Sequence, residues 1–255
     1  MKTHTTIGSA IALLALLATS AQAAVLVDFK MTADGQGLAS ALSVAPTTSN
    51  TNITVSGLLN QAGQATTGSN NFNAGTDRVS IWTTALASSG NVTYANAFST
   101  GNYVTFSVTA NAGFSITLDS ISFQVAAATS SATANRAFHL VSETSPGAFS
   151  ALSTVLESDS TPNAGGAIPL QAANPIDTVP ADYSVSLASL GVINEGETRH
   201  FRFYLQTDTA SQGIAFDDIV LNGTVAASAI PEPSALALLA GVGGLGVAAL
   251  RRRRR

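Results

Sequence analysis

The 255-residue chain contains no cysteine. This absence excludes disulfide bonds, thiolate metal sites and a cysteine nucleophile. It does not exclude export from the cell, because a domain of this size can bury enough apolar surface to fold without disulfide bonds. About 205 residues remain between the two terminal segments described below, which is enough for one all-β domain.

Charged residues are also scarce, at 10% of the chain, against about 25% in typical globular domains. Six of the eleven basic residues lie at the two chain ends. Residues 24–230 hold only five basic residues against fourteen acidic ones, a net charge of −9. Because no basic stripe is present to neutralise phosphates, the composition argues against nucleic acid as a partner.

The N-terminal stretch has the three parts of a secretory signal peptide. Lys2 gives a positive start, the residues from Ile7 to Ala18 form an apolar core, and Ala21 and Ala23 complete an A-x-A cleavage signal. We therefore expect residues 1–23 to form a signal helix that is removed after Ala23. Signal peptidase and the export machinery are the partners that this segment implies.

The C-terminal residues 229–255 have the features of a membrane anchor. Ser234 to Leu250 are mostly apolar and would span about 25 Å as a helix, near the lower limit for a hydrocarbon core of ~30 Å. An arginine at the bilayer centre costs roughly 2.5 to 3.5 kcal/mol, so a run of five stops translocation and stays cytoplasmic. These stop-transfer residues are Arg251, Arg252, Arg253, Arg254 and Arg255. We expect the body to lie outside the inner membrane.

Two prolines separate this helix from the body. Pro231 and Pro233 cannot donate backbone hydrogen bonds, so they keep Glu232 in an extended, accessible stretch. The order of Pro-Glu-Pro, an Ala/Leu/Gly-rich helix and terminal arginines resembles the PEP-CTERM sorting signal of Gram-negative bacteria over residues 230–255.

The resemblance implies that an exosortase, a membrane transpeptidase, recognises Pro231, Glu232 and Pro233 and cuts at or near them. It also implies that the protein is anchored only transiently in the inner membrane. Its destination would be the cell surface, the outer membrane or the extracellular matrix, in association with exopolysaccharide or biofilm material. The alternative is an ordinary single-pass anchor that is never processed.

Between these ends, several stretches alternate apolar and polar residues with period two, which predicts half-buried strands. The clearest are 103–110, 114–125, 200–207 and 214–225, and the weaker ones are 25–30, 53–56, 79–82, 137–142 and 183–187. The phase slips by one at Asp119 and Ser120, which predicts a β-bulge or a tight turn. No amphipathic helix of three or more turns is expected in this region.

About ten short strands with polar, turn-rich connections favour an all-β domain over residues 24–228, a two-sheet β-sandwich or jelly roll. A β-solenoid is disfavoured because no repeat is present. The stretches 113–125, 136–153 and 213–225 are similar to β-sandwich domains found upstream of such sorting signals. That similarity implies a fold and little about activity, although related sandwiches include carbohydrate-binding modules.

One face of the predicted strand 200–207 carries the candidate site residues His200, Arg202, Tyr204 and Gln206. These side chains could bind sugar hydroxyls. Jelly-roll polysaccharide lyases place similar groups on a concave sheet, where a Tyr or His can move protons near neutral pH. The alternative is the exposed polar face of an outer strand. Trp82, the only tryptophan, is either a platform for a sugar ring or a core residue.

Asp217 and Asp218 could contribute oxygen ligands to calcium. The alternative for this pair is a strand boundary or a solvated turn. No H-E-x-x-H or G-x-S-x-G motif is present, so no catalytic residue and no other cofactor are expected.

Taken together, the sequence predicts a non-enzymatic, exported surface or matrix protein. Its structural or adhesive role would be linked to exopolysaccharide or biofilm. The alternatives are a carbohydrate-binding module and a jelly-roll polysaccharide lyase.

Overall fold

The computed structural model describes residues 23–29, 43–46, 48–60, 79–82, 92–127, 130–172, 179–209 and 212–228. The expected membrane helix 234–250, the Pro231–Pro233 motif and the terminal arginines lie outside these ranges, as does the expected signal segment up to residue 22. Ala23 directly precedes the first strand and is exposed. Within the described ranges, no helix has the length and apolar character needed to cross a membrane.

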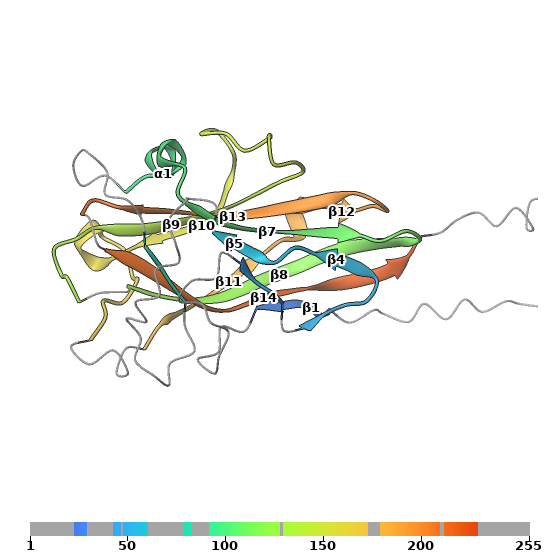
Figure 1. Cartoon of the computed structure of the whole chain (residues 1–255), viewed down its shortest axis with the longest axis horizontal. Coiled ribbons are helices and arrows are strands. Elements are labelled where there is room, and N and C mark those ends of the chain that lie inside the picture. The colour runs from blue at the N-terminus through green and yellow to red at the C-terminus, as the bar shows by residue number, and fades with distance from the viewer. Residues whose placement is uncertain are drawn as a thin grey trace, which may run out of the picture.

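The described residues form two antiparallel sheets that lie face to face, as Figure 1 shows. The strands of the first sheet are β11 (Ala181–Ser186), β8 (Phe114–Ala127), β14 (Gly213–Ala227), β1 (Ala24–Phe29) and β3 (Thr48–Ser49), in that order, with β12 (Val192–Ile193) on β8 and β6 (Val79–Trp82) on β14. The strands of the second sheet are β10 (Val155–Ser160), β9 (Arg136–Glu143), β13 (Thr198–Thr207), β7 (Tyr103–Ala110), β5 (Leu58–Asn60) and β2 (Ser43–Val44), with β4 (Ile53–Val55) on β7. The expectation of an all-β, two-sheet domain is confirmed.

The nine stretches that alternate in sequence all form strands. Five further strands, β2, β3, β5, β10 and β12, were not expected, so the described ranges hold fourteen strands where about ten were predicted. Four of the five have only two or three residues, which is too short to show a period. The fifth, β10, has the sequence VLESDS and lacks alternating burial.

The core lies between the two sheets and is rich in phenylalanine. The Phe123 ring on β8 has its centroid 5.0 Å from that of Phe203 on β13 and 5.4 Å from that of Phe138 on β9. Phe106 stacks on Phe201 at 4.9 Å within the second sheet. Edge-to-face and offset contacts of this kind add to the stabilisation from burial. The predicted inward residues of β7 and β13 are buried in this core.

A β-bulge accounts for the phase slip in β8. Ser120 pairs with Asn222, but the next pair joins Leu118 to Gly223, so Asp119 is an extra residue. The bulge turns both halves of the strand toward the core, and Leu118 and Ile121 are buried. The strand continues through the bulge, which rules out the alternative of a tight turn.

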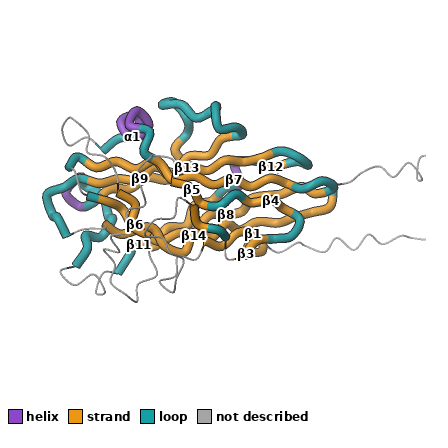
Figure 2. The backbone as a smooth tube through the Cα atoms, in the orientation of Figure 1, coloured by secondary structure: helices purple, strands orange, loops and turns teal. Residues whose placement is uncertain are grey.

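One short helix and two 3-10 turns complete the described elements. The helix α1 (Tyr94–Thr100) begins after Thr93, whose hydroxyl accepts from the backbone N–H of Asn96 at 3.4 Å, and ends at Gly101 with φ of 68°. It packs on the outer face of the second sheet, over β13 and β9 (Figure 2). The two 3-10 turns are η1 (Pro162–Ala164) and η3 (Ala188–Leu190).

Candidate functional site

The candidate residues of 200–207 lie on a central strand. β13 runs between β9 and β7 in the second sheet, so the interpretation as an outer strand is wrong. The outward face is also only partly exposed. Tyr204 and Gln206 are each 1% exposed, while His200 and Arg202 are half-buried. The sequence alternates as an exposed strand does, but another layer covers part of this face.

That layer consists of α1 and the loop 144–154, which both lie above the second sheet in Figure 1. Five rings meet beneath it and form what we call the outer aromatic cluster. Tyr204 is at its centre, with ring centroids of neighbouring side chains 5.2 to 6.3 Å away. The surrounding rings are Tyr94, Phe98, Tyr103 and Phe149.

Arg202 is held inside this cluster. Its guanidinium carbon lies 4.2 Å from the centroid of the Tyr103 ring and 4.0 Å from that of Phe149. Nη1 donates a hydrogen bond to the Tyr204 hydroxyl at 3.0 Å, and Nη2 donates to the carbonyl of Pro146 at 3.1 Å. Arg202 forms no ion pair with any residue in the described ranges. The weak hydration and planar shape of a guanidinium suit it to such a stack.

The same layer is tied down by a second tyrosine. The Tyr94 hydroxyl on α1 donates to the carbonyl of Ser150 at 2.8 Å, which joins the helix to the loop. Burial, with a smaller contribution from Tyr204, raises the pKa of Tyr94 to about 12. Burial also raises the pKa of Tyr204. Both hydroxyls therefore stay protonated near neutral pH, where Tyr94 donates to Ser150 and Tyr204 accepts from Arg202.

Both histidines of the described domain lie beside the cluster. Burial first, and the nearby Arg202 charge second, lower the pKa of His200. Burial lowers the pKa of His139 to about 4, so its imidazole is neutral at neutral pH. His139 is 6% exposed, and its ring centroid lies 5.9 Å from that of Tyr94. Its Nε2 has no hydrogen-bond partner within the described part of the chain.

A pocket of about 190 Å³ opens over His139. We call it the His139 pocket. Its other walls come from the approach to α1, from β9 and β10, and from the turn after η1, and they consist of Val92, Ala137, Ser158, Asp159, Ser160, Ala164, Gly165 and Gly166. A small ligand in this pocket would lie against the His139 side chain and the polar groups of Ser158, Asp159 and Ser160.

The structure does not bring the other predicted site residues to this face. Trp82 ends β6 and pairs with Gly213 of β14, in the first sheet. Asp217 and Asp218 lie at a second register shift, in β14, where Asp218 is exposed and has φ of 46°. Aspartate tolerates this left-handed conformation better than most residues. The described ranges contain no group of three or more potential metal-ligating side chains. Calcium binding by the pair stays a prediction.

Sequence reasoning missed Tyr94, Tyr103, Phe149 and His139 as members of one site. Tyr103 and His139 flank Tyr204 because β7 and β9 pair with β13. The packing of α1 and the loop onto the sheet then adds Tyr94 and Phe149. The half-buried rings of Tyr94, Phe98 and Tyr103 form a surface that can contact the face of a sugar ring. Comparisons of the chain with protein-family models, with curated proteins and with solved structures found no match.

Proposed function

We propose that this chain is an exported protein of the bacterial cell surface or extracellular matrix, sorted as a PEP-CTERM substrate, whose β-sandwich associates with polysaccharide. Support for export and sorting comes from the sequence alone. This support consists of the A-x-A cleavage signal at Ala21 and Ala23 and of the C-terminal signal, whose three parts follow one another over residues 230–255.

One structural observation supports the association with polysaccharide. Tyr94, Phe98 and Tyr103 are half-buried rings on the outer face of the second sheet, and Arg202 lies beside them without an ion pair to any residue that the structure describes. Aromatic faces pack against the apolar faces of sugar rings, while guanidinium and tyrosine hydroxyl groups provide hydrogen bonds. Tyr204 and Gln206 would then hold this surface in shape and would not contact the glycan.

Binding to a panel of acidic and neutral polysaccharides tests the proposal. We expect the full chain, purified in detergent, to bind at least one member, and Tyr94→Ala and Tyr103→Ala each to weaken binding about tenfold, which corresponds to about 1.4 kcal/mol. Tyr183→Ala is the matched control, because Tyr183 is a half-buried tyrosine that stacks on Phe123 in the main core.

The control separates loss of the surface from loss of stability. Tyr183→Ala removes the same group from the core and should destabilise the fold at least as much, yet it should leave binding unchanged at a temperature where the fold persists. Absence of binding to every polysaccharide would contradict the proposed association. If Tyr94→Ala and Tyr103→Ala bind polysaccharide as strongly as the control Tyr183→Ala, the outer aromatic cluster is not the contact surface.

A further inference from the structure

A second pocket lies at the end of the sandwich where the described domain begins and ends. At this end Ala24 pairs with Gly223, and the backbone N–H of Ser228 donates to the carbonyl of Gly113 at 2.8 Å. The turn before β13 is next to them, because the N–H of Gly196 donates to the carbonyl of Ala110 at 2.9 Å. The pocket has a volume of about 260 Å³.

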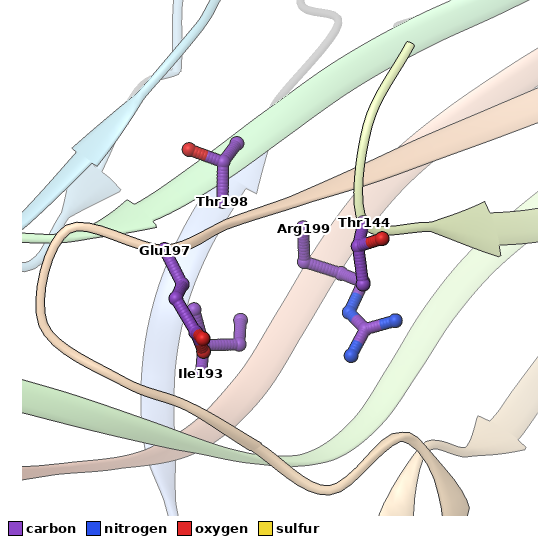
Figure 3. Close-up of a pocket in the computed structure, with 5 residues that line it drawn as sticks. All are labelled: Thr144, Ile193, Glu197, Thr198 and Arg199. Carbon is purple, nitrogen blue, oxygen red and sulfur yellow. The ribbon is translucent and has the colours of Figure 1, made fainter. Parts of the chain in front are cut away.

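We call this the Arg199 pocket, and its lining residues are Thr144, Ile193, Glu197, Thr198 and Arg199. Figure 3 shows the side chains of Glu197 and Arg199 leaving the chain on the same side, and Thr198 on the opposite side. Residues two apart in an extended chain share a side in this way. Ile193 also lines the pocket and is only 2% exposed, so it forms an apolar part of the pocket wall.

The two charged groups of the pocket are held in place separately. Nη2 of Arg199 donates to the carbonyl of Leu190, in η3, at 2.8 Å. The Glu197 carboxylate accepts from the backbone N–H of Asn194 at 2.9 Å and from its side-chain amide at 3.0 Å. These contacts orient both side chains before any ligand is present.

The two charges nevertheless remain unpaired. Neither Glu197 nor Arg199 forms an ion pair, with the other or with any residue that the structure describes. Nε of Arg199 is buried and has no hydrogen-bond acceptor among the residues that the structure describes. Buried donors of this kind are rare in folded proteins and call for a partner. A ligand that carries an anionic and a cationic group could contact Arg199 and the solvent-exposed carboxylate of Glu197 at once.

The charge of the domain favours a ligand without net charge. Residues 24–230 carry a net charge of −9, which repels a simple anion as it approaches Arg199. A zwitterion meets no such repulsion.

The pocket is also slightly smaller than the ~300 to 1,000 Å³ of sites for drug-sized ligands, which favours a compact molecule. We propose that the Arg199 pocket binds a small zwitterion of the amino acid type, with its carboxylate on Arg199 and its ammonium group on Glu197.

Calorimetric titration of the purified full chain tests this site. The probes are glycine, β-alanine and 4-aminobutyrate, in which the two charges lie progressively further apart, with acetate and methylammonium as singly charged references. We expect at least one of the three zwitterions to bind ten times more tightly than acetate, because only zwitterions engage both side chains. Arg199→Met should weaken that binding at least tenfold.

Glu197→Gln is the decisive variant. A glutamine keeps an acceptor for the Asn194 N–H, so the turn should fold as before, but the ammonium group loses its counter-charge. We expect zwitterion binding to fall to the level of acetate while acetate binding does not weaken. Glu195→Gln is the matched control, because it removes a neighbouring exposed carboxylate outside the pocket and should not reduce zwitterion binding.

Three outcomes would overturn the assignment. The first is that no zwitterion binds more tightly than acetate. The second is that Glu197→Gln binds zwitterions as the wild type does, and the third is that Glu195→Gln has the same effect as Glu197→Gln. Because both Gln variants should keep the fold, which circular dichroism would check, the result does not depend on whether Arg199→Met is stable. The site is also independent of the outer aromatic cluster, so either proposal can fail alone.

Discussion

The guanidinium carbon of Arg202 lies 4.0 Å from the centroid of the Phe149 ring. Phe149 comes from the loop 144–154, so this contact holds the loop against β13. The Tyr103 ring stacks on the other side at 4.2 Å, and the hydrogen bond from Arg202 to the Pro146 carbonyl reinforces the same arrangement. Arg202 therefore joins the outer layer to the sheet by stacking and hydrogen bonds, without an ion pair in the described ranges.

We expect Arg202→Met to lower the free energy of unfolding by about 1 to 3 kcal/mol, because it removes a cation between two rings and two hydrogen bonds. Arg202→Lys keeps the charge but loses the planar group, so it should recover only a part of this loss. Urea denaturation measures both variants, and limited proteolysis of the loop 144–154 shows whether it detaches. Unchanged stability and unchanged cleavage in Arg202→Met would show that the stack does not hold the loop.

The stability of the domain should depend on pH through His139. Burial lowers the pKa of this imidazole from the usual 6.5 to about 4 in the folded protein. Between these values the unfolded chain binds a proton that the folded chain does not, so the free energy of unfolding falls as the pH drops from about 6.5 to about 4. Each pH unit in this window costs about 1.4 kcal/mol.

Denaturation curves at several pH values isolate this effect when wild type is compared with His139→Gln. Carboxylates titrate in both proteins, so the difference between the two curves belongs to His139. The difference in free energy of unfolding between wild type and His139→Gln should change between about pH 4 and 6.5 and be constant above pH 7. The matched control is His200→Gln, which should change the slope less because His200 is only half-buried. If the free energy of unfolding of wild type and of His139→Gln varies with pH in the same way, the lowered pKa of His139 is contradicted.

The strands were predictable where burial alternates along one segment. In β7 the pattern YVTFSVTA places every second side chain in the core, and the structure follows it residue by residue. The slip at Asp119 was also visible in the sequence, but the sequence left a β-bulge and a tight turn open, and the pairing of β8 with β14 shows the bulge. β10 was missed because its burial comes from neighbouring elements and not from its own alternation.

The candidate site was harder to read from sequence. The outward residues of β13 suggest a polar surface, but Tyr204 is buried by residues that are distant along the chain, Tyr94 in α1 and Phe149 in the loop. A seven-residue helix leaves a weak periodic signal. Nothing local shows that it packs on the outer face of the sheet, so the cluster emerges only from tertiary contacts.

Gly223 should tolerate no larger residue. A Cβ at this position would collide with the backbone carbonyl of Thr117 and lie 2.8 Å from Cδ1 of Leu26. We expect Gly223→Ala to lower the free energy of unfolding by about 1 to 3 kcal/mol, the usual cost of overpacking. Gly147→Ala is the matched control, because a Cβ there meets nothing within 4 Å, and thermal unfolding compares the two. Equal stability of these variants would show that the bulge opposite Gly223 relaxes to make room.

Processing at both ends is the prediction that tests the sorting proposal. In the described domain the N–H of Ser228 donates to the carbonyl of Gly113, and Pro231 follows three positions later in the sequence. We expect the mature protein from cells to lack both Met1–Ala23 and the terminal arginines, as intact-mass spectrometry would show. Glu232→Ala should leave the arginine tail on the protein, whereas Ser228→Ala, outside the motif, should be processed normally. If the tail is intact on the bulk of the wild-type protein, the segment is a permanent anchor and the exosortase assignment is wrong.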